Sequence, residues 1–147
     1  GVQMIWQTGS HYYDRMREMA EAQGVTRIRV TGFINRMDLA YAAADVIISR
    51  AGAGTISELA LVAKPVILVP SPNVAEDHQT HNAMALVNRG AAMLVRDADA
   101  QDELVKTAIV LVNDTAKRSS LSENIRKMAI RDADEVIAGE VLKMVKR

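Results

Sequence analysis

Short apolar runs alternate along this chain with longer segments in which apolar residues recur every three or four positions. The runs are rich in valine and isoleucine, a composition typical of buried strands in parallel sheets. The clearest run is Val46-Ile47-Ile48. The runs predict five strands, over residues 2–6, 27–31, 46–48, 66–69 and 91–95.

The segments between the runs have the spacing of amphipathic helices. In one of them Leu104, Ala108 and Leu111 fall on a single face. Ser10 is predicted as the N-cap of the first helix, and Gly24 as the residue that ends it. The other predicted helices cover residues 37–44, 55–62, 78–88, 102–112, 115–129 and 132–146.

This alternation predicts an α/β fold: a Rossmann-like open sheet of mostly parallel strands, flanked by helices and forming one domain over residues 1–147. Right-handed crossovers are nearly obligatory in such sheets, and their ligands bind at the carboxyl ends of the strands. Candidate chemistry is therefore sought in the turns that follow the predicted strands.

Composition narrows the function classes. The chain has 18 basic and 18 acidic residues, so no global field attracts nucleic acid or an anionic membrane. Its single tryptophan and single phenylalanine also argue against base-stacking platforms. Cysteine is absent, which excludes disulfides, thiolate catalysis and cysteine-ligated zinc. No apolar run approaches the length that crosses a bilayer.

The turn after residues 46–48 is the strongest candidate site. It carries Gly52 and Gly54 and is predicted to lead into a helix that Thr55 opens. A glycine turn before a helix N-terminus brings unpaired N–H groups and the positive end of the helix dipole to one place, which favours phosphate. Glu58, predicted in the first helical turn, has the chemistry to accept hydrogen bonds from ribose hydroxyls. Its alternative role is to complement the helix dipole.

Two further turns carry weaker signals. Gly32-Phe33-Ile34 offers backbone groups and an apolar wall to a flat base, or simply packs Phe33 into the core. The second turn is a long loop that leads into Asp77-His78-Gln79, with Asn82 one helical turn on, and amide and imidazole groups there suit sugar hydroxyls. In the alternative reading Asp77 is a plain N-cap.

Competing motifs are less consistent with the sequence. A nicotinamide cofactor is disfavoured because Ser57 stands where a third glycine is expected, and no cofactor is expected. There is no Gly-Lys-Ser/Thr phosphate loop and no Gly-x-Ser-x-Gly elbow. The acid pairs Asp97-Ala-Asp99 and Asp132-Ala-Asp134 precede predicted helices and are expected to act as caps. His78 and His81 lack further ligands, so no metal site is predicted.

Four segments together resemble one known family. They are Phe33-Ile34, Ser49-Arg-Ala-Gly-Ala-Gly-Thr-Ile-Ser-Glu58, Lys64-Pro-Val-Ile-Leu-Val-Pro70 and Asp77-His-Gln-Thr-His-Asn-Ala83. In this order and spacing they are similar to the C-terminal, donor-binding domain of the MurG family, and the resemblance spans essentially the whole chain. Those bacterial enzymes transfer N-acetylglucosamine from its UDP donor to undecaprenyl-diphospho-muramoyl-pentapeptide in peptidoglycan synthesis.

The resemblance implies a role for each candidate residue. Ile34 would meet the uracil, largely through its backbone, and Glu58 would hold the ribose hydroxyls. Gln79, with His78 beside it, would read the hydroxyls of N-acetylglucosamine. The diphosphate and the sugar would be lined, at the helix N-terminus, by Gly52, Ala53, Gly54 and Thr55. Asn82 is the remaining candidate, suited to sugar hydroxyls.

The resemblance also implies what lies outside this sequence. Family members carry an N-terminal domain that binds the lipid acceptor at the cytoplasmic face of the plasma membrane and supplies the catalytic base, so this chain alone is expected to be inactive. The first strand of the donor domain would also precede Gly1 and lie between residues 2–6 and 46–48. We therefore expect a gap in the sheet, altered pairing there, or a dimer that borrows a strand.

Two other readings stay open at this stage. The chain is alternatively a donor subunit that works with a separate acceptor-binding chain, as in the eukaryotic dolichol-linked N-acetylglucosaminyltransferase. It is otherwise a non-catalytic α/β binding module that keeps only the fold.

Overall fold

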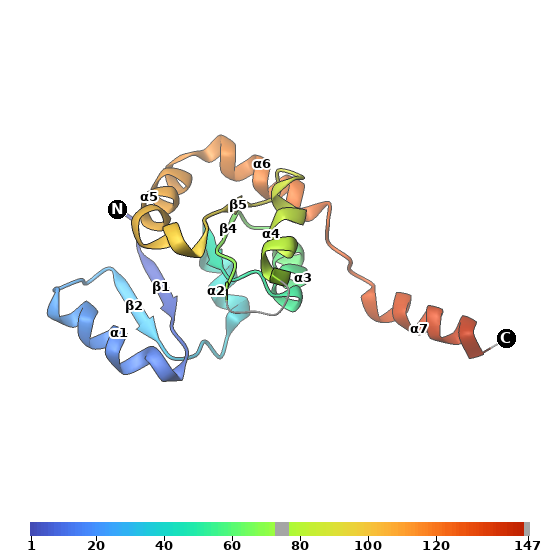
Figure 1. Ribbon diagram of the computed structural model, residues 1–147, viewed down its shortest axis with the longest axis horizontal. Helices are drawn as coiled ribbons and strands as arrows, with labels where there is room; N and C mark the ends of the chain where they lie inside the picture. The colour runs from blue at the N-terminus through green and yellow to red at the C-terminus, as the bar shows by residue number, and fades with distance from the viewer. Residues whose placement is uncertain (73–76, 146–147) are drawn as a thin grey trace. The chain divides into compact units, whose positions relative to one another are not determined.

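The computed structural model describes residues 1–72 and 77–145 (Figure 1). Residues 73–76, in the predicted long loop that leads into Asp77, and the predicted helix end at residue 146 lie outside the described residues. The chain divides into two compact units, Gly1–Asp45 and Val46–Arg147. Each unit is described by itself below.

The first unit is a pair of parallel strands with two helices. In chain order its elements are β1 (Met4–Gln7), α1 (Ser10–Ala22), β2 (Ile28–Thr31) and α2 (Met37–Ala43). β1 and β2 pair in parallel, with Met4 opposite Ile28, and α1 packs against β2. None of residues 1–45 is buried, and the side chain of Ile5 on β1 is 53% exposed.

The ends of α1 test two of the capping predictions. Gly24 follows the C-cap with φ of 63°, which confirms that a glycine ends this helix. The prediction for Ser10 is wrong, because Gly9 occupies the N-cap position and Ser10 is the first helical residue. Gly9 has φ of 76°, a backbone conformation that glycine adopts without strain, so it makes the turn into the helix.

The second unit is built on three parallel strands in the order β3-β4-β5. Ile47 pairs with Val66, and Ile67 pairs with Met93. Around the strands, α3 packs against α4 and α6, and α5 packs against α6. In chain order the elements are β3 (Ile47–Ser49), α3 (Ala53–Val62), β4 (Val66–Leu68), α4 (His78–Val87), β5 (Met93–Leu94), the 3-10 turn η2 (Asp97–Asp99), α5 (Ala100–Asn113), α6 (Thr115–Arg126) and α7 (Ala133–Val145).

The core of the second unit surrounds β4. Val66, Ile67 and Leu68 have no exposed surface, as expected of a central strand covered on both faces. A cluster of buried apolar side chains joins this strand to β5, α5 and α6. Its members are Ile67, Val69, Val95, Leu111 and Leu121.

The five predicted strands and seven predicted helices are all present in the described residues, so the α/β class with parallel strands and flanking helices is confirmed. The strands form two separate sheets, β1-β2 and β3-β4-β5, rather than one. In the described residues there is no helix of the length and apolarity that a bilayer requires.

Because no side chain of residues 1–45 is buried, we expect β1 and β2 to open at lower free energy than β4. Their amide hydrogens should exchange on the order of 100-fold faster than those of Val66–Leu68 in native-state hydrogen exchange. When exchange is measured residue by residue, the amides of β4 serve as the control for those of β1 and β2, since all three strands are in one molecule. Equal protection of β1 and β4 would contradict the expectation.

Candidate functional site

The turn between β3 and α3 presents a helix N-terminus at the carboxyl end of β3. Gly52 holds the N-cap position of α3 and brings no side chain to accept from the N–H groups of the first turn. The carbonyl of Gly52 accepts a hydrogen bond from the N–H of Ile56 at 2.9 Å. The N–H groups of Ala53, Gly54 and Thr55 belong to that first turn, which has no acidic residue. This combination favours a bound anion.

Glu58 lies in the second turn of α3, not the first as predicted. The hydrogen bond between Gly52 and Ile56 starts the helix at Ala53, two residues before the predicted start at Thr55. The helix dipole acts within about one turn, so complementing the dipole explains Glu58 less well. Glu58 is exposed and follows Thr55 and Gly54 at intervals of three and four residues, so it shares their face of the helix.

Two amide side chains of α4 hold this turn. Gln79 Oε1 accepts hydrogen bonds from the N–H of Ala51 at 3.1 Å and from the N–H of Ser71 at 2.9 Å. Asn82, one turn further along α4, donates from Nδ2 to the carbonyl of Ala51 at 3.0 Å. Ala51 is fully buried, so these bonds fix both polar groups of a residue that water does not reach. We call Gln79, Asn82, Ala51 and Ser71 the amide clamp.

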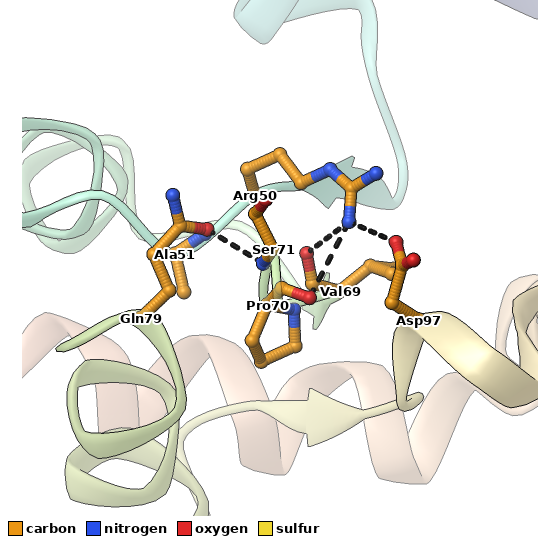
Figure 2. Close-up of polar contacts among 7 residues, drawn as sticks. All are labelled: Arg50, Ala51, Val69, Pro70, Ser71, Gln79 and Asp97. Atoms are coloured by element: carbon orange, nitrogen blue, oxygen red, sulfur yellow. Dashed lines mark hydrogen bonds and ion pairs between the residues drawn. The ribbon is translucent and has the colours of Figure 1, made fainter. Parts of the chain in front are cut away.

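The amide clamp leaves the two ends of the Gln79 side chain with different roles. Its oxygen is engaged with two backbone donors, and its nitrogen points away from Ser71 (Figure 2). The nitrogen is therefore the end that suits an acceptor on a ligand, such as a sugar hydroxyl oxygen.

The start of α4 differs in detail from the capping prediction. Asp77 occupies the N-cap position with φ of 53°, but its carboxylate makes no capping bond to the backbone. Asp77 Oδ1 instead accepts from the hydroxyl of Thr80 at 2.6 Å. His78 follows as the first residue of α4 and is exposed, as is His81. No group of three His, Cys, Asp or Glu side chains suited to a metal occurs in residues 1–72 and 77–145.

Arg50 is a site residue that the sequence did not reveal. It follows β3 directly, and its Nη1 donates to the carbonyls of Val69 at 3.2 Å and Pro70 at 3.4 Å. The same nitrogen forms an ion pair with Asp97 (Figure 2). The one available signal was an arginine placed between a buried strand and a glycine turn.

Asp97 and Asp99, which the sequence predicts as helix caps, have separate arginine partners; Asp99 occupies the N-cap position of α5 but its side chain makes no capping bond. Asp97 binds Arg50, and Asp99 Oδ2 accepts from Nε of Arg96 at 2.7 Å. Their carboxylates are thus each engaged with an arginine. This arrangement gives them structural roles at the end of β5.

Ile34 lies in the first unit, at the turn that follows β2. Its backbone N–H donates to Oε1 of Gln7 at 2.9 Å. The preceding carbonyl, that of Phe33, accepts from the hydroxyl of Thr31 at 3.0 Å. The side chain of Phe33 is 71% exposed, so the alternative in which it packs into the core is wrong. The turn presents an apolar ring and backbone groups, as a site for a flat base requires.

An exposed ion pair follows the same turn. The Arg36 guanidinium donates to both carboxylate oxygens of Asp38, at 2.9 and 2.6 Å. The hydrogen bond from Arg36 lowers the pKa of the Asp38 carboxyl, and the same bond raises the pKa of Arg36. The pair lies on the solvent side of α2 and is worth little to stability.

Of the predicted site residues, the structure brings together those of the second unit. Gly52, Ala53, Gly54 and Thr55 form the helix start, Glu58 lies one turn further on, and Gln79 and Asn82 bond to the residue before the turn. His78 adjoins Gln79 at the start of α4. Ile34 belongs to the first unit.

Known proteins share both the sequence and the fold. The profile of the glycosyltransferase family 28 C-terminal domain matches residues 1–137. A Bacteroides fragilis protein is 54% identical over 147 residues, covering 99% of this chain and 39% of its own length. A Porphyromonas gingivalis protein is 52% identical over 145 residues, covering 99% of this chain and 38% of its own length. Both are named UDP-N-acetylglucosamine--N-acetylmuramyl-(pentapeptide) pyrophosphoryl-undecaprenol N-acetylglucosamine transferase.

Solved structures agree with the sequence relatives. The crystal structure of Acinetobacter baumannii MurG matches with a TM-score of 0.83 and 28% identity, over 95% of this chain and 42% of that one. The glycosyltransferase VinC, solved in complex with dTDP, matches with a TM-score of 0.64 and 19% identity over 85% of this chain and 29% of its own, which indicates a shared fold. This chain spans about two fifths of the length of the curated relatives it matches.

The amide clamp makes a prediction about stability. Gln79→Ala removes the acceptor of two backbone N–H groups, one of them on fully buried Ala51. We expect the free energy of unfolding in urea to fall by about 1–3 kcal/mol. Gln79→Glu keeps an acceptor oxygen at the start of a helix and should lose less than half of that. His81→Ala, an exposed position on α4, is the control, and unchanged stability of Gln79→Ala would contradict the clamp.

Proposed function

This chain belongs to the glycosyltransferase family 28 C-terminal domain family, and from that premise we propose that it binds UDP-N-acetylglucosamine as the donor half of an inverting glycosyltransferase. The full enzyme would transfer N-acetylglucosamine to a lipid-linked muramoyl-pentapeptide in peptidoglycan synthesis. Support comes from the names of relatives 50–54% identical over nearly the whole chain.

One observation carries the proposal: a helix N-terminus without a capping side chain, followed one turn later by an exposed carboxylate. The diphosphate lies against the first-turn N–H groups of Ala53, Gly54 and Thr55, where the partial positive charge of α3 is greatest. One helical turn spans about 5.4 Å. In the proposed binding mode Glu58 lies beside the ribose, whose vicinal hydroxyls donate to the carboxylate.

The sugar and the base are read by the remaining residues. Nε2 of Gln79 donates to a hydroxyl oxygen of N-acetylglucosamine, while Oε1 keeps its two backbone bonds. His78, exposed beside it, contributes a second polar contact. Asn82 acts through the carbonyl of Ala51, holding the turn on which the diphosphate rests. Ile34 receives the uracil edge, and its N–H becomes available when the Gln7 side chain turns aside.

This geometry suits the departure of UDP. As the bond from the anomeric carbon to the diphosphate breaks, negative charge grows on the leaving oxygen. Backbone N–H groups that are already oriented stabilise that charge without rearrangement. The proposed mechanism assigns this role to α3 and requires no metal ion. We assign the acceptor-binding site, and the base that deprotonates the acceptor hydroxyl, to the part of the relatives' sequences that this chain does not cover, about three fifths of their length.

The location follows from the substrates. The acceptor is a pyrophosphoryl-undecaprenol lipid in the names of the relatives, whereas the donor is a soluble nucleotide sugar. We therefore place the parent enzyme on the cytoplasmic face of the plasma membrane, bound peripherally.

The experiment is a calorimetric titration of UDP into the 147-residue chain and its Glu58→Gln variant. We expect binding to weaken about 10- to 100-fold, because hydrogen bonds to a charged group contribute about 1.5–3 kcal/mol. With dUDP, which lacks the 2′-hydroxyl, the loss should be smaller. Glu135→Gln, an exposed position on α7, is the matched control. Equal UDP affinity in Glu58→Gln and the unmodified chain would remove Glu58 from its role.

We also propose that a second copy of the chain pairs with the outer edge of β3. In support, β3 ends its sheet, with β4 as its one strand partner among the described residues. Unpaired edges of this kind recruit other strands. Light scattering after size exclusion should give a molar mass that rises with concentration toward a dimer. The N–H of Ile47 donates to the carbonyl of Pro65 on the β4 side, so the backbone N–H of the next residue, Ile48, faces the outer edge of β3. Ile48→Pro removes that outward donor and is expected to shift the equilibrium to monomer if its circular dichroism stays native. A constant monomer mass would contradict the proposal.

A further inference from the structure

Arg50 connects the carboxyl ends of all three strands of the second unit. It follows β3, and the carbonyls that its Nη1 contacts, those of Val69 and Pro70, follow β4. Its ion-pair partner, Asp97, lies three residues beyond β5 (Figure 2). One guanidinium thus bridges segments that lie 19, 20 and 47 positions away in the sequence.

The segment over residues 69–71 is held from two sides. Arg50 binds the carbonyls of Val69 and Pro70, and Gln79 binds the N–H of the next residue, Ser71. Val69 and Pro70 are buried, so their carbonyls have few alternatives to these bonds. A shift of this segment would move Ser71 and the oxygen of Gln79 together. The same oxygen also holds Ala51, the residue before the glycine turn.

We propose that Arg50 and Asp97 form a brace that positions the amide clamp, and through it the donor-binding turn. This inference rests on the proposed function, since the turn is where the diphosphate would lie. Arg50 is here a positioning residue and acts through Gln79 and Ala51. Its Nη1 is directed toward two carbonyls and a carboxylate rather than toward the N-terminus of α3.

The exposure of the brace indicates a role in geometry more than in stability. The side chains of Arg50 and Asp97 are 55% and 37% exposed, and ion pairs of that kind contribute little to folding. The carbonyl contacts are what give the guanidinium a fixed position. Loss of the brace should therefore change donor affinity in a protein that remains folded.

The test is a double-mutant cycle with Arg50→Met, Asp97→Ala and the double variant. Binding of UDP and of UDP-N-acetylglucosamine is measured by calorimetry at a temperature where circular dichroism shows every variant folded. We expect each single variant to bind UDP-N-acetylglucosamine about 5- to 10-fold more weakly, and the double variant no more weakly than either, because the two residues act as one unit. Exchange of the Ser71 amide hydrogen should accelerate in all three.

The neighbouring pair supplies a matched control. Nε of Arg96 donates to Asp99, three residues further on, at 2.7 Å, and in the described part of the chain the Arg96 guanidinium contacts no carbonyl. Arg96→Met is expected to leave both donor affinity and Ser71 exchange unchanged.

The alternative role, direct contact of Arg50 with the diphosphate, gives a different pattern. Asp97→Ala would then leave donor affinity unchanged or raise it by releasing the guanidinium, and this result would overturn the brace. Unchanged affinity in every variant would also overturn it. If the unmodified chain bound no donor, the proposed function would fail, and the positioning role would fail with it.

Discussion

The organisation of the second unit's site depends on one amide oxygen that accepts from two backbone donors. Gln79 Oε1 accepts from the N–H of Ala51, which lies just after β3, and from the N–H of Ser71, which lies just after β4. Parallel strands deliver their carboxyl ends to one edge of the sheet, but nothing in the sheet's own hydrogen bonds fixes the loops beyond that edge. A side chain from α4 does so here, and Asn82 adds the complementary bond to the Ala51 carbonyl.

In this arrangement one set of residues offers N–H groups to an anion and another set holds those groups in position, although the sequence motif contains only the first set. The glycine turn and the first turn of α3 offer N–H groups, and the chemistry of anion binding follows from backbone alone. Placing those groups is the work of side chains from elsewhere: Gln79, Asn82 and the Arg50–Asp97 pair. Residues near a ligand are therefore of two kinds, and a substitution's effect on affinity does not by itself reveal which kind was changed.

Local patterns predicted what is local. The apolar runs located all five strands of the described residues within a few positions. For β4 the physical reason is clear, because a parallel strand buried on both faces needs such residues. The glycine at the end of α1 followed from its backbone freedom. The start of α3 was misplaced, since Gly54 is a poor helix former and the helix start is set by one backbone hydrogen bond, from Ile56 to Gly52. The role of Glu58 was proposed from its neighbours in sequence and on a helix face, which is information that a single segment contains.

Local sequence patterns could not predict contacts between residues that are far apart in the sequence. Arg50 and Asp97 lie 47 positions apart, and Gln79 and Ala51 lie 28 apart, so no periodicity links them. The exposure of Phe33 was left open for the same reason: an apolar residue in a turn faces the core or the solvent according to what the fold brings near it. The family resemblance supplied roles for several residues, and the hydrogen bonds of Gln79 add a second, structural role to one of them.

The glycine at the N-cap of α3 affects how binding of a ligand at this helix end can be detected. Gly52 lacks the side-chain hydrogen bond that serine or aspartate would make there, so no N-cap side chain accepts from the first-turn N–H groups of α3. An anion bound at that end would act as the missing cap. Ligand and helix would then stabilise each other, and occupancy would be visible as a rise in melting temperature that grows with the concentration of nucleotide.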